Sequence, residues 1–579
     1  MGVFVFLRFV VLILFVIFSS CQNRHIEKQV LSGMKASAIR PLSHEEKAAD
    51  FDQLIQIFKT YYGPYQYKES RFGFSIEQLA MNLKQQAMSS KTDEEFMGYV
   101  MQFGAALQDG HVQFRVENSA SNVRRYTIPI LLMDIEGKAI IGSISKDLSD
   151  WTGLKVGDEV LSVDGQTPAE IRLLAQKYKK FATDLSNQAL IINTFSRSSF
   201  MTDIIPQKPL ATVKVLKKNN EIAFFEIPWT QDKYNAVLDS IIRTRPGTLN
   251  LSVPFADEYN AIVPDSHLGQ MGQVEPVFLT PQALSTYGFV KVYPSSAALM
   301  RFGLKGDEKP GIYAALYKFL GKTILLVRSA TYSPSDYNGA VYLKAYMALL
   351  SEYESLADVL VLDQTHNPGG SYCASFYDIF AKPGDVQGVE KVRADRKWIN
   401  DLFINWPVTE NPAGNIWDTK LLQSWGSVVE KAYDNHEFLS EPFPLFTGSS
   451  FATKQAYTWT KPMLVLIDEL AGSCGDIFPM LVKANKRAKL FGRQTMGLGG
   501  NVEPVGQLNH SRITVSLTRG LFYPYRTDGV VQNSDYIENN GVLPDYEYNH
   551  TVSDFRNGYI QYIQMFSQKA IEQLNPSSK

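Results

Sequence analysis

The segment Leu464–Pro479 reads LVLIDELAGSCGDIFP, and it contains the transition that decides the fold. Its first residues form an apolar run typical of strands that are buried on both faces of a parallel sheet. The run ends in two carboxylates, and small or flexible residues then present one serine, Ser473, before a second apolar stretch. This order predicts a buried strand followed by a helix, with Ser473 where the strand gives way to the helix.

A serine in that place has two interpretations. Serine is a preferred N-cap residue, so Ser473 could simply close the first turn of the helix. Alternatively, it is a nucleophile, because the N–H groups of the first helical turn lack intrahelical partners and can stabilise an oxyanion.

The C-terminal half repeats the pattern of strand and helix from about Ala236 onward. Buried strands are expected in KTILLVRSA, DVLVLDQ, PMLVLIDE and AKLFG, with helices in GAVYLKAYMALLSEYESL and IFPMLVKANKRA. This alternation predicts an α/β layer with a mostly parallel sheet, whose ligands bind beyond the carboxyl ends of the strands. A second unusual loop, DQTHNPGGS, follows Leu362 at such an end. Its Gly369 and Gly370 permit close approach of another backbone, although a Pro-Gly turn alone is common.

The N-terminal half predicts two other kinds of structure. From Glu45 to Phe114 apolar residues recur at helical spacing, and Thr92 with Glu95 has the spacing of a capping box. The last helix leads directly into QDGHVQF, a turn that contains His111. Tyr126 to about Trp229 then predicts short strands and a hairpin.

The first residues predict export. One early cation precedes an apolar run from Phe9 to Phe18, then Ser19, Ser20 and Cys21. The run is shorter than the ~20 residues that span a bilayer, so it is interpreted as a signal peptide. A plain secretory signal with an incidental cysteine is the alternative.

Composition excludes several classes of protein. The chain has 579 residues, 45% of them hydrophobic and 20% charged, so several globular domains are expected. A net charge of -2 gives no electrostatic bias toward nucleic acid. Only three cysteines and eight scattered histidines occur, without metal-ligand spacing, so neither a metal nor a cofactor is predicted. Packed cores are expected to supply the stability, and the sequence assigns no partner to Cys474.

Several motifs together carry a family resemblance. VLVLDQTHNPGGS, PMLVLIDELAGSCGDIF, GRQTMGLGG and YIENNGVLPD resemble, in order, the C-terminal-processing (tail-specific) serine peptidase family. GLKVGDEVLSVDG resembles a permuted PDZ domain, and the small-small-Cys ending of the leader resembles the lipobox of bacterial lipoproteins, with Phe18 in place of the usual leucine. The resemblance implies an α/β multidomain fold with a ClpP/crotonase-like core. The expected parts are a signal peptide (1–20), a tether (21–44), a helical N-terminal region (45–120), a PDZ-like domain (121–235) and a peptidase core (236–575).

The same resemblance assigns roles to residues and shows departures. It implies that Ser473 is the nucleophile, with Gly369, Gly370 and the Cys474 amide as oxyanion donors. Leu498 stands where the best-known bacterial members have a lysine base, which excludes a Ser–Lys dyad at that position. Thr365 replaces a usual arginine. The segment Thr127–Leu131 replaces the Gly-rich loop that binds peptide carboxylates, which weakens the case for tail recognition.

The missing lysine leaves the base to be found elsewhere. The chain is similar to the tricorn-core branch in LQDGHVQF and IENNGVLPD, which implies His111 as the base and Glu538 as an orienting or electrostatically supporting group. His111 could instead interact with a helix dipole, and Glu538 could be a solvated loop carboxylate. His366 is the competing base. Asp476, near the helix N-terminus, is expected to have a structural role.

The expected function is that of an exported serine endopeptidase, lipid-anchored through Cys21 in the bacterial cell envelope, with a polypeptide substrate. Without a true lipobox the protein would be secreted. An α/β-hydrolase-type esterase using Ser473, Asp545 and His550 is one alternative. A catalytically inactive peptidase-like binding protein is the other. The sequence predicts no oligomeric state.

Overall fold

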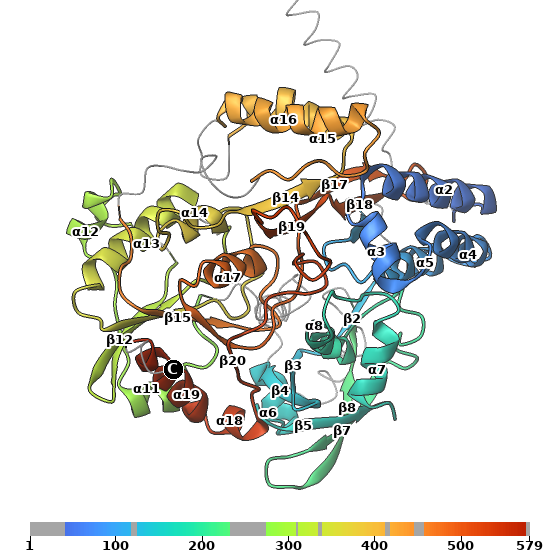
Figure 1. Cartoon of the computed structure of the whole chain (residues 1–579). Helices are drawn as coiled ribbons and strands as arrows, with labels where there is room; N and C mark the ends of the chain where they lie inside the picture. Colours follow the sequence, from blue (N-terminus) through green and yellow to red (C-terminus); the bar gives the residue numbers. More distant parts are fainter. Residues whose placement is uncertain are drawn as a thin grey trace, which may run out of the picture.

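The computed structural model describes residues 41–116, 124–231, 274–308, 311–333, 339–410, 417–444 and 457–574. The predicted signal peptide and Cys21 lie outside the described residues. Figure 1 shows an α/β core, helices of the N-terminal region against one side of it, and a smaller β domain below these helices. In the part of the chain that is described, no helix has both the length and the hydropathy to cross a membrane.

The core is built on a seven-stranded sheet in the order β10-β11-β12-β13-β15-β16-β20. The strands from β12 to β20 run parallel, and β10 and β11 form an antiparallel edge. Their bounds are β10 Val290–Lys291, β11 Ala314–Phe319, β12 Lys322–Arg328, β13 Val359–Asp363, β15 Met463–Ile467, β16 Lys489–Gly492 and β20 Tyr546–Glu547. Every residue of β13 and β15 is buried, as expected for parallel strands that are covered on both faces.

Helices cover both faces of this sheet. One apolar cluster joins the sheet to α12 (Ser296–Arg301), α13 (Gly339–Tyr353), α14 (Cys373–Tyr377) and α17 (Cys474–Ala484). A second cluster on the other face includes side chains of α11 (Pro281–Tyr287) and α19 (Ile560–Glu572), with α18 (Val552–Arg556) beside them. The predicted α/β class of the core is therefore confirmed. Because β13 and β15 are neighbouring parallel strands, the loops after them open at the same edge of the sheet.

The N-terminal region is helical, as predicted. Its elements are α2 (His44–Tyr61), α3 (Tyr65–Phe72), α4 (Ile76–Met88), α5 (Asp93–Ala106) and the strand β1 (Gln113–Val116). Thr92 caps α5 by accepting the Glu95 N–H at 3.1 Å, but the Glu95 carboxylate bonds the Lys91 N–H instead of closing the capping box. Strand β1 pairs with β18 (Ile513–Thr518), which in turn pairs with β17 (Val502–Gln507). This small sheet attaches the N-terminal helices to the C-terminal half of the chain.

The β domain has a five-stranded sheet in the order β3-β4-β5-β7-β8 and a three-stranded one in the order β6-β2-β9. The strands are β2 Arg125–Thr127, β3 Ile130–Ile135, β4 Lys138–Ile144, β5 Glu159–Val163, β6 Ser196–Ser198, β7 Leu210–Leu216, β8 Ile222–Pro228 and β9 Thr230–Gln231. The helices are α6 Lys146–Thr152, α7 Pro168–Ala175, α8 Asp184–Gln188 and the short helix η1 Ala189–Thr194. The predicted hairpin is formed by β7 and β8, with Asn220 at a positive φ of 65° in its turn.

A separate apolar cluster lies above the core in Figure 1. It packs around Trp398 and Trp425 from α15 (Arg396–Asn400) and α16 (Thr419–Asp434), with the short helices η2 (Asp401–Asn405) and η3 (Trp406–Val408) beside them. Strand β14 (Gly388–Val392) pairs with β19 (Gly520–Pro524) and connects this cluster to the core.

Candidate active site

Ser473 lies between strand β15 and helix α17, as the sequence predicts, but its backbone is not that of an ordinary N-cap. It has φ 57° and ψ -119°, a region that non-glycine residues rarely occupy, and its side chain makes no capping hydrogen bond. Such a conformation costs about 1–3 kcal/mol and persists only where the surroundings impose it. Ser473 is partly exposed while Gly472 and Cys474 are buried, so the strained turn presents this hydroxyl residue at the surface.

The first turn of α17 is held by an interaction that depends on a proline. Pro479 lies inside the helix and has no N–H to donate to the carbonyl of Gly475, four residues earlier. That carbonyl accepts a hydrogen bond from Nε2 of Gln364 at 3.0 Å instead. Gln364 follows β13 directly, so the proline allows the loop after β13 to bind the beginning of α17.

The glycine loop after β13 packs directly against Ser473. A Cβ on Gly369 would lie 2.7 Å from the Ser473 Cβ and 2.8 Å from the Cys474 nitrogen. The Gly472 N–H donates to the carbonyl of Asn367 at 3.0 Å, which adds a backbone link between the two loops. The close approach predicted from the glycine pair is therefore present in the structure.

The two glycines differ as hydrogen-bond donors, which corrects one expectation. The Gly369 N–H donates to Oδ1 of Asn367 at 2.9 Å, so Gly369 is not a free oxyanion donor here. Within the described residues, neither the Gly370 N–H nor the Cys474 N–H donates a hydrogen bond. Gly370 is partly exposed, as is Ser473. The pair of unbonded N–H groups beside Ser473 thus comes from Gly370 and Cys474.

Asp476 fixes the segment Thr495–Leu498, where Leu498 occupies the position of the lysine base expected from the family resemblance. Its buried carboxylate accepts hydrogen bonds from Thr495 Oγ1, the Gly497 N–H at 2.8 Å and the Leu498 N–H at 2.9 Å. Burial raises the pKa of Asp476 to about 7, against the effect of these donors. This is the structural role that the sequence suggested for it.

Leu498 also connects the loops that carry His111 and Ser473. A Cβ on Gly110 would lie 3.3 Å from Cδ1 of Leu498, and a Cβ on Gly472 would lie 3.2 Å from the same atom. The residues that precede His111 and Ser473 in the chain therefore flank one methyl group. The structure thus brings the turn after α5 to the same end of the sheet as the nucleophile turn, although these turns are far apart in the sequence.

The turn that holds His111 is fixed by a buried aspartate and two lysines. Asp109 accepts the His111 N–H at 2.9 Å, and its other oxygen accepts the hydroxyls of Tyr62 and Thr518. Lys68 donates to the carbonyl of Gln108 at 3.2 Å, and Lys179 donates to that of Gly110 at 3.0 Å. The QDGH signal could have shown Asp109 as a turn residue, but no sequence signal shows that two lysines bind the carbonyls on either side of it.

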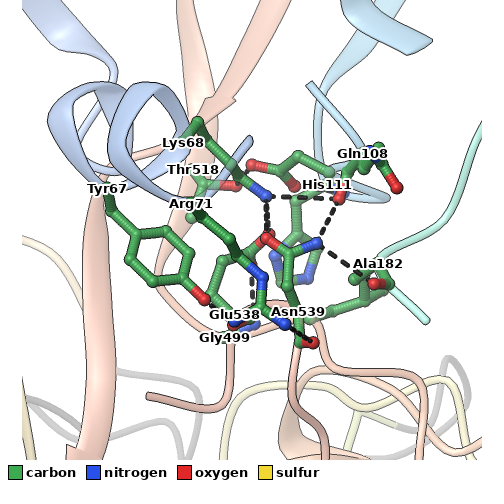
Figure 2. A network of polar contacts seen from close by, with 12 residues as sticks. Tyr67, Lys68, Arg71, Gln108, His111, Ala182, Gly499, Thr518, Glu538 and Asn539 are labelled. Atoms are coloured by element: carbon green, nitrogen blue, oxygen red, sulfur yellow. Dashed lines mark hydrogen bonds and ion pairs between the residues drawn. The ribbon is translucent and has the colours of Figure 1, made fainter. Parts of the chain in front are cut away.

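Glu538 is buried in the same cluster and is not the solvated loop carboxylate of the alternative interpretation (Figure 2). Its carboxylate pairs with Nζ of Lys68 and accepts the Gly499 N–H at 3.1 Å. Nδ1 of His111 has no hydrogen-bond partner among the described residues. The Glu538 carboxylate is bonded to Lys68 and Gly499 and makes no hydrogen bond to His111 among the described residues, so it does not orient the imidazole by direct contact. Burial and the Asp109 carboxylate raise the pKa of Glu538, while Lys68 opposes the shift.

The surroundings of His111 keep its imidazole neutral. The residue is buried, with 6% of its surface exposed, and burial lowers its pKa to about 4. Asp109 opposes this shift, while Lys179 and Lys68 add to it. A neutral imidazole can accept a proton, whereas a charged one cannot.

His366, the competing base, is held by a different partner. Its Nδ1 lies 2.6 Å from Oδ2 of Asp468, and its backbone N–H donates to the other oxygen of the same carboxylate. Burial lowers the pKa of His366, but Asp468 outweighs burial, and the net shift is upward. This pair joins the loops after β13 and β15.

The esterase arrangement is not assembled. Asp545 pairs with Lys489 and accepts the Leu490 N–H beside β16. The ring of His550 packs against the rings of Tyr548, Tyr559 and Tyr562, on the face of the sheet that α19 covers. The α/β-hydrolase alternative is therefore wrong.

A disulfide that the sequence did not assign lies beside the nucleophile. Cys474, the residue after Ser473, is bonded to Cys373 at the beginning of α14. Both residues are buried. A sequence separation of 101 residues gave no local signal for this pairing.

Comparison with known proteins identifies the core. Residues 315–548 match peptidase family S41, and residues 124–237 match a PDZ domain. The core therefore carries a peptidase family S41 domain. The chain is thus a serine-type peptidase, and the predicted fold of helical region, PDZ domain and α/β peptidase core is confirmed.

The relatives found by sequence and by structure extend over most of the chain. An uncharacterized protein of Chlamydia muridarum is 25% identical over 581 residues, covering 91% of this chain and 92% of the relative. A protein of Chlamydia trachomatis serovar D is 23% identical over 584 residues, covering 91% and 92%. The structure of mature CPAF complexed with lactacystin superposes with a TM-score of 0.70 at 21% identity, covering 92% of this chain and 99% of that one. This last similarity shows a shared fold.

Substitution of Gly369 by alanine is expected to reduce kcat/KM for a peptide substrate by about 10²-fold or more, since the new Cβ displaces Ser473 and the Cys474 amide. Gly384→Ala is the matched control, because Gly384 also has a positive φ, 90°, yet open space surrounds its Cβ position. Steady-state kinetics and the melting temperature of both variants measure the effect. Equal activities of the two variants would contradict the packing argument.

Lys179→Met is expected to move the acid limb of kcat/KM to higher pH. Lys179 lowers the pKa of His111, so its removal raises that pKa from about 4 toward the ordinary value of a histidine. The pH profile of kcat/KM reports groups of the free enzyme and is the measurement to make. Lys177→Met serves as the control, since Lys177 pairs with Asp203. An unchanged acid limb in the Lys179 variant would argue against His111 as the base.

Proposed function

We propose that the chain is an exported, lipid-anchored serine endopeptidase that uses Ser473, His111 and Glu538. The observation that carries this proposal is the strained turn of Ser473 packed against Gly369, with two unbonded N–H groups beside it. Strain of this kind gathers at functional sites, because the surrounding contacts must pay for it.

The proposed reaction begins with attack of Ser473 Oγ on the carbonyl carbon of a peptide bond. His111 accepts the hydroxyl proton, since its low pKa keeps it neutral at physiological pH. The N–H groups of Gly370 and Cys474 stabilise the oxyanion of the tetrahedral intermediate, and His111 then returns the proton to the leaving amine. A water molecule, deprotonated by His111, then attacks the acyl-enzyme carbonyl in the same way, and the free acid and the Ser473 hydroxyl are released.

Glu538 acts in this proposal through the electrostatic field rather than by contact. Once His111 has accepted a proton, the imidazolium lies in a buried region and requires nearby negative charge. Asp109 is the carboxylate that raises the pKa of His111, and Glu538, paired with Lys68 in the same cluster, is proposed to add to its field. Support for this assignment comes from the burial of Asp109 together with His111, Lys68 and Glu538, the last three of which lie together in Figure 2.

Labelling by a fluorophosphonate probe tests the nucleophile and the base, because only an activated serine reacts rapidly. Ser473→Ala is expected to abolish labelling and casein hydrolysis, and His111→Ala is expected to reduce both by ~10²–10⁴-fold. Melting temperatures should stay nearly unchanged. Ser553→Ala, in α18, is the control for the serine.

Two outcomes would overturn the assignment. Hydrolysis retained by the Ser473 variant would exclude it as the nucleophile. A loss of labelling in His366→Ala together with full labelling in His111→Ala would transfer the role of base to His366. A wild-type chain that is folded but never labelled would instead favour the inactive binding protein.

The proposed anchor rests on the leader sequence alone. Cys21 follows an apolar run and two small residues, and a bacterial lipoprotein signal would make it the lipid-bearing N-terminus. Cells grown with labelled palmitate are expected to incorporate label into the wild-type chain and not into Cys21→Ser. Cys373→Ala, which leaves the leader intact, should retain the label. Export without incorporation would show a plain secretory signal.

A further inference from the structure

The Cys373–Cys474 disulfide joins the two segments that carry the unbonded N–H groups. Cys474 carries one of these groups itself and directly follows Ser473. Cys373 lies three residues after Gly370, which carries the other. The bond therefore connects the two sides of the proposed oxyanion site. A catalytic role for it rests on the proposed function.

Hydrogen bonds between these segments lie on the N-terminal side of the glycines. They include the bond from the Gly472 N–H to Asn367, the bond from Gln364 to the Gly475 carbonyl and the bond from the His366 N–H to Asp468. After the glycines, the loop binds a different part of the chain, because the Ser371 N–H donates to the carbonyl of Tyr332. The disulfide thus adds a covalent link from the C-terminal side of the glycine loop to the nucleophile turn, beside the packing of Phe376 and Tyr377 against Phe478 of α17.

The disulfide is also placed where backbone strain must be maintained. Ser473 holds φ 57° and ψ -119°, and the next residue is the one that is covalently bonded. Helix α14 has only five residues and no side-chain N-cap, so by itself it fixes Cys373 weakly. Loss of the bond would let the turn relax toward ordinary backbone angles and move the Cys474 N–H.

We propose that the Cys373–Cys474 disulfide is a positioning element of the active site, and that peptidase activity requires its oxidised form. A small dithiol reduces the bond by transferring two electrons and two protons, which gives two thiols in the protein and a cyclic disulfide of the reductant. Disulfides persist in oxidising compartments and are rare in the cytosol. Absence of the bond therefore leaves the chain inactive before export, and formation of the bond completes the site afterwards.

Kinetics of oxidised and reduced full-length protein test this proposal, with dithiothreitol as the reductant and labelled casein as the substrate. Reduction is expected to lower kcat roughly tenfold to hundredfold, less than the complete loss of an oxyanion donor, with little change in KM. Thiol titration under denaturing conditions establishes that both thiols have formed. Reoxidation should restore kcat.

Cys373→Ala provides the second arm, because it breaks the bond and leaves the side chain at position 474 a cysteine. Its kcat should fall as in the reduced protein, and dithiothreitol should change it no further. Unchanged kcat in this variant or after verified reduction, with only a lower melting temperature, would show a purely stabilising bond and overturn the proposal. Rapid fluorophosphonate labelling of oxidised wild type tests the proposed function separately, so the two failures are distinguishable.

Discussion

Close contact between the loops after β13 and β15 is the constraint on which the rest of the site depends. Gly369 lies so near to Ser473 and Cys474 that a single added carbon would overlap with both. Such an approach needs parallel neighbouring strands, since only then do both loops leave the sheet at the same edge. The strained Ser473 backbone follows from this contact, because an isolated turn would relax.

Three further interactions hold the strained turn in place. Pro479 frees a carbonyl of α17 for Gln364, Asp476 binds the segment before Leu498, and the disulfide closes the far side of the glycine loop. Each link joins segments that are distant in sequence, so the turn is determined by the tertiary structure. A site of this kind is preorganised, and its N–H groups need little rearrangement when charge develops.

Much of this arrangement could be predicted from the sequence. The apolar runs of β13 and β15 and the small residues after them indicated both strand-end loops, and Ser473 lies where the pattern placed it. The glycine pair indicated close approach, but the sequence could not tell which N–H remains unbonded, because that depends on the rotamer of Asn367. Lys68 was missed, since a lysine on an amphipathic helix normally faces solvent, and its burial depends on Glu538, 470 residues later.

Because the proposed site is divided between two regions of the chain, the Lys68–Glu538 pair also has a role in holding these regions together. The proposed base belongs to the N-terminal region, while the nucleophile belongs to the α/β core, so a core alone could not complete the reaction. The buried Lys68–Glu538 pair crosses this boundary, as does the pairing of β1 with β18. Removing one partner of a buried pair costs ~3–5 kcal/mol, because the other charge is left without compensation. The interaction that holds Glu538 in the cluster around His111 therefore also fastens the region that carries His111 to the core, and assembly of the proposed base is coupled to docking of the N-terminal helices.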